Sequence, residues 1–90
     1  MIDVKEAVRI AIHFAKELIP TEDFDSITLE EVELAQHEPF WYVTLGFKKQ
    51  VAADPLMVFT GKTANLIIRY KIFQINRDSG EVISMKIRKD

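Results

Sequence analysis

The sequence predicts an α+β fold, in which one N-terminal helix packs on a four-stranded antiparallel meander sheet. Two observations support this prediction. Apolar residues recur at helical spacing over 3–19, and four later segments alternate apolar and polar residues as strands do. Ninety residues is the size of one domain, so we expect 1–90 to form a single core. The composition, 48% hydrophobic and 29% charged, is that of an ordinary globular domain.

The predicted helix spans residues 3–19. Asp3 suits the N-cap position, and Glu6 follows three residues later, which is the capping-box spacing. Pro20 predicts the end of the helix, because the residue before a proline avoids helical backbone angles. The apolar stripe of the helix consists of Val4, Ala7, Val8, Ala11, Ile12, Phe14, Ala15 and Leu18. Its three alanines would let the helix lie close to a sheet.

Four segments are predicted to be strands: 27–35, 40–49, 67–77 and 81–88. In the first segment the apolar residues change parity between Leu29 and Val32, which predicts a β-bulge near Glu30 and Glu31. The second segment alternates cleanly. The sheet face expected to meet the helix consists of Trp41, Val43, Leu45, Phe47, Phe73, Ile75, Ile83, Met85 and Ile87.

The stretch YKIFQINRDSGEVISMKIRK (70–89) predicts the last hairpin. A three-residue loop at 78–80, with Gly80 in the left-handed conformation, places Ile75 opposite Ile83 and Phe73 opposite Met85. One face of the hairpin is then apolar and the other mostly polar. The Asp78-Ser79 pair has no nearby histidine to activate a nucleophile, so we interpret it as a turn.

Residues 50–66 are predicted to be a long loop, with a higher apolar content than an exposed loop usually has. Two interpretations remain open: the loop packs on the body or extends a strand, or it offers an apolar patch to a partner. The candidate partner-binding residues are Leu56, Met57, Val58 and Phe59 in this loop, together with Tyr42, Tyr70 and Ile72 on the sheet face that the helix leaves open.

Charge is unevenly distributed along the chain. Residues 22–38 contain seven acids and no Lys or Arg, whereas 48–90 contain nine Lys or Arg and four acids. Pairing of adjacent strands can neutralise this asymmetry internally. Alternatively, the acidic segment covers a basic surface of another protein. With a formal net charge of −2, nucleic-acid binding is not expected.

The sequence predicts no catalytic residue, cofactor or metal. It contains no cysteine, and His13 and His37 have no ligand spacing. The Gly61-Lys62-Thr63 stretch lacks the upstream glycine of a phosphate-binding loop, since Leu56 stands there. Glu31 and Glu33 share a strand parity but have no predicted cleft around them. We therefore expect a protein that is not an enzyme.

The N-terminal stretch carries charges at residues 3, 5, 6 and 9, which interrupt any apolar core of a signal peptide. No run of residues approaches the length of a membrane span. We expect a cytoplasmic location.

The stretch YKIFQINRDSGEVISMKIR (70–88) resembles the end of PepSY-type domains, whose strands meet in an Asp-x-x-Thr-Gly-Glu-Val hairpin. Here residues 76–82 form the corresponding stretch, with Asn76 and Ser79 in place of Asp and Thr. The layout is also similar to cystatin-like and nuclear-transport-factor-like architectures found among small bacterial immunity proteins. The resemblance implies a domain that binds or restrains peptidases, with no catalytic residues.

These observations predict a non-enzymatic binding or regulatory module that contacts a protein partner through the 50–66 loop or the open sheet face. The alternative is an immunity-type or antitoxin protein that uses the acidic 22–38 segment. A homodimer through the open face or an edge strand is a lesser expectation. The identity of the partner is left open.

Overall fold

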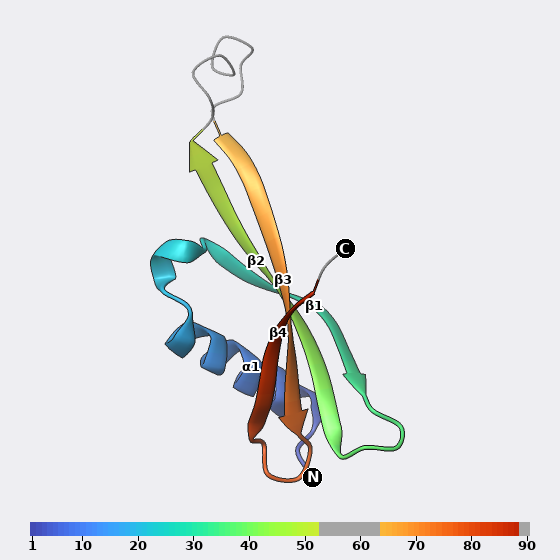
Figure 1. Ribbon diagram of the computed structural model, residues 1–90. Helices are drawn as coiled ribbons and strands as arrows, with labels where there is room; N and C mark the ends of the chain where they lie inside the picture. The colour runs from blue at the N-terminus through green and yellow to red at the C-terminus, as the bar shows by residue number, and fades with distance from the viewer. Residues whose placement is uncertain (53–63, 89–90) are drawn as a thin grey trace.

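The computed structural model describes residues 1–52 and 64–88. It contains one α-helix and a single four-stranded antiparallel sheet of order β1-β2-β3-β4, with the helix on one face (Figure 1), so the predicted α+β fold is confirmed. The elements are α1 (Val4–Leu18), the short 3-10 helix η1 (Thr21–Asp23), β1 (Ser26–Leu34), β2 (Phe40–Ala52), β3 (Ala64–Asn76) and β4 (Val82–Arg88).

Helix α1 begins at the predicted N-cap, Asp3, but within the described residues no hydrogen bond from the Asp3 backbone N–H to Glu6 completes the predicted capping box. The Asp3 carboxylate accepts a hydrogen bond from the backbone N–H of Glu6 at 2.9 Å. The Glu6 carboxylate accepts hydrogen bonds from the Arg9 side chain. At the other end, Ile19 is already extended, directly before Pro20.

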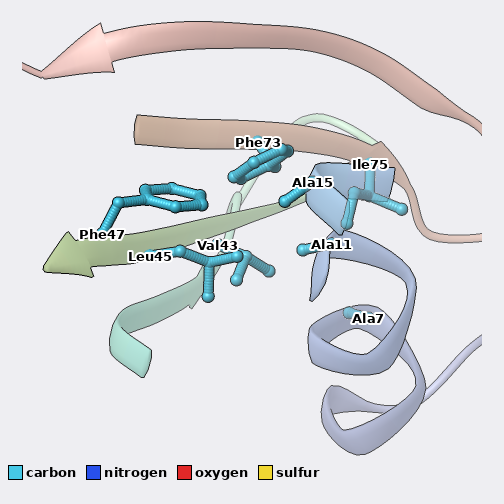
Figure 2. Close-up of a cluster of buried hydrophobic side chains, with 8 residues drawn as sticks. All are labelled: Ala7, Ala11, Ala15, Val43, Leu45, Phe47, Phe73 and Ile75. Carbon is cyan, nitrogen blue, oxygen red and sulfur yellow. The ribbon is translucent and has the colours of Figure 1, made fainter. Parts of the chain in front are cut away.

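The core lies between α1 and the sheet (Figure 2). Ala7, Ala11 and Ala15 are fully buried and form the line along which the helix meets the strands. Because these side chains are single methyl groups, the helix backbone lies close to the sheet. The other fully or almost fully buried apolar residues come from the two central strands: Val43, Leu45, Phe47, Phe73 and Ile75.

Strand β1 contains the predicted bulge. Leu29 pairs with Leu45 and Glu31 pairs with Thr44, so Glu30 is the extra residue. The bulge restores the apolar parity: Ile27 and Leu29 before it, and Val32 and Leu34 after it, all pair with residues of β2 that face the helix.

The register predicted for the last hairpin is correct away from the turn and wrong near it. Phe73 pairs with Met85 as predicted, but Ile75 pairs with Val82 rather than Ile83. The loop has four residues, 77–80, because the Asn76 side-chain oxygen accepts hydrogen bonds from the backbone N–H groups of residues 78 and 79. A bulge at Ile83 then restores the predicted register.

Two residues predicted to lie in the core are exposed. Ile83 sits in this bulge and is 47% exposed, and Val82 packs against the core in its place. Ile87 is 72% exposed. It lies on the outer strand β4 opposite Lys71, so its neighbour on β3 is a charged residue rather than a core residue. Trp41 and Met85 are partly buried against the core as predicted.

The two central strands are longer than predicted. The pairing of β2 with β3 continues from Lys48↔Ile68 out to Ala52↔Ala64, so both ends of the predicted 50–66 loop belong to strands. We call residues 49–52 and 64–67 the hairpin arm. It extends beyond the last residue of β1 that pairs with β2, Ser26 (Figure 1). Residues 66–68 are consecutive apolar residues that are all exposed, which hides the strand alternation in the sequence.

Candidate functional site

The candidate site is the sheet face opposite α1, which we call the open sheet face. Within residues 1–52 and 64–88, no helix covers it (Figure 1). Because side chains alternate along a strand, this face is formed by the residues between the core positions. They are Thr28, Glu30, Glu31 and Glu33 on β1; Tyr42, Thr44, Gly46 and Lys48 on β2; Ile68, Tyr70, Ile72 and Gln74 on β3; and Ser84, Lys86 and Arg88 on β4.

Three of the predicted site residues, Tyr42, Tyr70 and Ile72, are brought together on this face. Tyr70 and Ile72 lie at alternate positions of β3 and are half-buried, and Ile68 continues the same apolar line with 39% exposure. Tyr42 lies on the neighbouring strand β2, opposite Gln74. The other candidates, residues 56–59, lie outside the described residues.

Gly46, at the centre of the face, leaves room for the side chains of two β1 residues, Thr28 and Glu30. It pairs with Tyr70 on β3 and with Thr28 on β1. A Cβ atom on Gly46 would lie 2.9 Å from Thr28 Oγ1 and 3.2 Å from Glu30 Cγ. The Glu30 side chain therefore lies over Gly46, where its carboxylate is 3.2 Å from the Thr28 hydroxyl.

The β1 bulge concentrates acidic residues on this face. In a regular strand Glu30 and Glu31 would point to opposite faces. Because Glu30 is the extra residue, Glu31 falls opposite Thr44 and Glu33 falls opposite Tyr42, so three glutamates share the open face. The parity change in the sequence predicts the bulge, and the gathering of the three glutamates on one face follows from the bulge.

Charge changes sign across the sheet in rows perpendicular to the strands. One row runs Glu31–Thr44–Ile72–Lys86. The next runs Thr28–Gly46–Tyr70–Arg88, with Glu30 over Gly46 and the Arg88 guanidinium 4.8 Å from the Tyr70 ring centroid. The open sheet face thus has an acidic margin on β1, an apolar centre on β3 and a basic margin on β4.

The surroundings of Tyr42 raise the pKa of its phenol. Desolvation of the phenol raises its pKa above the ordinary value, and the negative charges of Glu38 and Glu33 add to the increase. The Tyr42 hydroxyl donates a hydrogen bond to the Glu38 carboxylate at 3.3 Å. Tyr42 is therefore a neutral hydrogen-bonding group on this surface at physiological pH.

The acidic segment 22–38 does not form one surface. It is divided among η1, β1 and the β1–β2 connection, and several of its members contact the body. The Asp25 carboxylate accepts a hydrogen bond from the backbone N–H of Gln50 at 2.7 Å, and Glu38 binds Tyr42. Glu31 and Glu33 are exposed and make no salt bridge with any described residue.

The described residues contain no group of three or more His, Asp or Glu side chains placed to hold a metal ion. His13 pairs with Glu17 at 2.9 Å on the solvent side of α1, and His37 is exposed in the β1–β2 connection. The open sheet face instead combines apolar area with charged margins, an arrangement that suits contact with another surface.

Comparisons of the chain with protein-family models, with curated proteins and with solved structures found no match. The likeness to PepSY-type and cystatin-like domains stays a prediction. In the part of the chain that the structure describes, no helix combines the length and apolar character needed to cross a membrane.

Proposed function

We propose that this chain is a non-enzymatic, cytoplasmic protein-binding module whose contact surface is the open sheet face, and that the occupant this face fits best is a second copy of the chain. The observation that carries the proposal is the row Glu31–Thr44–Ile72–Lys86, in which the charge reverses from one edge of the sheet to the other. Such a surface is complementary to itself.

The symmetry follows from the strand order. A two-fold axis parallel to the strands, lying between two open faces, places β1 of one copy over β4 of the other at the same height along the strands. Glu31 then meets Lys86 of the other copy, and Glu30 meets Arg88. Both contacts occur twice, because a two-fold interface repeats each of them. The apolar line of β3 lies between these charged margins.

The size of the face indicates a weak dimer. Four strands about 4.8 Å apart and seven residues long, at about 3.3 Å per residue, cover about 450 Å² per copy. Two copies would bury about 900 Å², below the range of about 1,200–2,000 Å² for stable complexes. We therefore expect association in the micromolar range, set by Tyr70, Ile72 and the charged margins.

Sedimentation equilibrium tests the proposal, with protein concentrations up to about 1 mM to cover weak binding. The wild-type chain should associate reversibly, and Ile72→Glu should be monomeric because it places a charge at the centre of the contact. Leu18→Glu is the matched control. Leu18 is 57% exposed at the end of α1, on the other side of the molecule, and its replacement should leave association unchanged. Circular dichroism checks that each variant is folded.

A wild-type chain that stays monomeric over that whole range would exclude the second copy as occupant. The more general proposal of a protein-binding module is then tested by affinity capture, with the wild type, Ile72→Glu and Leu18→Glu as the three baits. A protein retained by the wild type and Leu18→Glu but not by Ile72→Glu would replace the second copy as the partner. Retention by all three baits, or by none, would exclude the open sheet face as the contact surface.

The 50–66 loop is the other contact surface predicted from the sequence. Replacing Leu56, Met57 and Phe59 with serine should leave the melting temperature nearly unchanged if these residues serve a partner. A large decrease would assign them to the core and remove the loop as a contact surface.

An immunity-type or antitoxin function is the second candidate. It is favoured by the acidic margin, where Glu31 and Glu33 are exposed and make no salt bridge with described residues. A basic partner bound there should dissociate as salt is raised from about 0.05 M to about 0.5 M, because screening weakens exposed ion pairs. Salt-independent binding would count against it.

A further inference from the structure

A recess lies on the helix side of the molecule, opposite the open sheet face. It is an open pocket of about 250 Å³ beyond the C-terminal end of α1. Its lining residues are Ile19, Asp23, Phe24, Phe47, Lys49, Arg69 and Lys71. None of them belongs to the open sheet face.

The pocket exists because the sheet continues past the end of the helix. After α1 ends at Leu18, Pro20 and η1 turn the chain back toward the sheet. Phe24 then packs edge-on against Phe47, with ring centroids 5.6 Å apart. Beyond this pair the strands still present residues to the helix side, and no part of α1 covers them.

Three of the uncovered positions are basic. Arg69 and Lys71 are alternate residues of β3, so both point to the helix side, and Arg69 is opposite Phe47. Lys49, two residues after Phe47 on β2, points to the same side. Three cations therefore surround an apolar patch made by Ile19, Phe24 and Phe47.

Within the described residues, none of these cations has an anionic partner. The Lys49 ammonium donates a hydrogen bond to the backbone carbonyl of Glu22, a neutral group. The Lys71 ammonium lies 5.9 Å from the centroid of the Phe47 ring. Arg69 makes no salt bridge with a residue that the structure describes. Asp23 is the single carboxylate that lines the pocket, so the lining carries three positive charges and one negative charge.

We propose that this pocket binds a small amphipathic anion, with a carboxylate or phosphate head on a body the size of one aromatic ring. Like charges on one face of a sheet repel each other, and an anionic head relieves that repulsion. The guanidinium of Arg69 matches the two oxygens of such a head, and the lysines add point charge. The volume lies just below the usual range for small-molecule pockets, about 300–1,000 Å³, which limits the body to about one ring.

The orientation of the ligand follows from the charges. The C-terminal end of α1 carries partial negative charge, and Asp23 is on the same side of the pocket. The anionic head is therefore expected on the strand side, against Arg69 and Lys71. The apolar body would then cover Phe24 and Ile19.

Titration followed by ¹H–¹⁵N NMR spectra tests the site, with four probes. Phenyl phosphate and phenylacetate carry both ligand features, inorganic phosphate carries the head alone, and benzyl alcohol carries the ring alone. We expect the two amphipathic anions to shift the backbone resonances of residues 24, 47 and 69, with a Kd near or below about 1 mM. The other two probes should bind at least about tenfold more weakly. Comparing the two heads then identifies which one the pocket prefers.

Substitutions of opposite sign make the test specific. Arg69→Gln removes an exposed cation and should weaken phenyl phosphate binding about fivefold or more. Asp23→Asn removes the opposing carboxylate and should strengthen binding. Lys5→Gln is the matched control, since it removes one positive charge at the far end of α1 and should leave the Kd within about twofold.

Three results would overturn the proposal. The first is that no resonance near the pocket shifts with either amphipathic anion at about 10 mM, ten times the expected Kd. The second is that benzyl alcohol binds as tightly as phenyl phosphate, which would mean that the cations take no part. The third is that Arg69→Gln and Lys5→Gln weaken binding equally, which would mean that only net charge matters. The proposal does not depend on the open sheet face, because Ile72→Glu leaves all seven lining residues in place.

Discussion

At the residue scale, Gly80 has the one positive φ angle among the described residues, +79°. It closes the four-residue turn between β3 and β4, where its N–H donates a hydrogen bond to the Asn76 carbonyl at 2.8 Å. The turn also lies under α1: a Cβ atom on Gly80 would be 3.1 Å from Ile10 Cδ1. Glycine is therefore favoured here by the backbone angle, and a larger residue would also have to displace the end of the Ile10 side chain slightly.

Gly80→Ala should lower the free energy of unfolding by about 1–2 kcal/mol, because a left-handed conformation is strained for alanine. Urea denaturation measures the change. Gly80→Asn separates the two causes, since asparagine tolerates this conformation but still adds a Cβ. An asparagine variant as unstable as the alanine variant would attribute the loss to the contact with Ile10, and an unchanged alanine variant would contradict the assignment of this turn.

The ionisation of Tyr42 gives a second prediction at this scale. The pKa of Tyr42 is raised by desolvation and then by Glu38 and Glu33, so Glu38→Gln should lower it toward its usual value. The absorbance of tyrosinate at alkaline pH measures it, in a Tyr70→Phe background where Tyr42 is the only tyrosine. The pKa of Tyr42 is higher in the folded protein than in the unfolded chain, where it is about 10. The contribution of Tyr42 to folding stability is therefore fully present below the unfolded pKa and is lost as pH rises through the folded pKa. An unchanged pKa in the glutamine variant would show that Glu38 does not act on Tyr42.

At the element scale, the sequence predicts where the helix and strands lie better than where they end. Residues 40–49 alternate between apolar and polar because one face of this strand is buried, and the alternation therefore predicts the strand well. At the base of the hairpin arm the apolar residues 66–68 are all exposed, so no buried face imposes an alternating pattern there. The strand continues because its backbone pairs with β2. The turn at 77–80 was mispredicted because the Asn76 side chain caps it, a local hydrogen bond that the apolar pattern does not record.

The alanine face of α1 was predicted, and its tight fit gives a prediction at this scale. Ala11 is fully buried at the centre of the helix, facing the sheet. Ala11→Leu should lower the free energy of unfolding by about 1–3 kcal/mol, because three added carbons must displace the helix or the sheet. Alanine and leucine have similar helix propensities, so propensity contributes little. Lys16→Leu, on the exposed side of the helix, is the control for urea denaturation and should change stability much less.

At the scale of the whole molecule, the candidate site was predictable only in part. Strand parity placed Tyr42, Tyr70 and Ile72 on the face away from the helix. The charged margins can be recognised only once the order of the strands is known. Glu31 and Lys86 are 55 residues apart in sequence, and they belong to one row only because β2 and β3 pair between them. The basic pocket was missed because it depends on where the helix stops relative to the sheet.

Charge reversal tests the symmetry of the proposed dimer directly. Glu31→Lys and Lys86→Glu should each abolish self-association, because in either homodimer residues 31 and 86 would carry the same charge. An equimolar mixture of the two variants should form a heterodimer, since residues 31 and 86 then carry opposite charges at both contacts. Sedimentation equilibrium at low salt measures the three samples. A mixture that stays monomeric, while each variant is folded by circular dichroism, would show that β1 does not lie over β4 of the second copy.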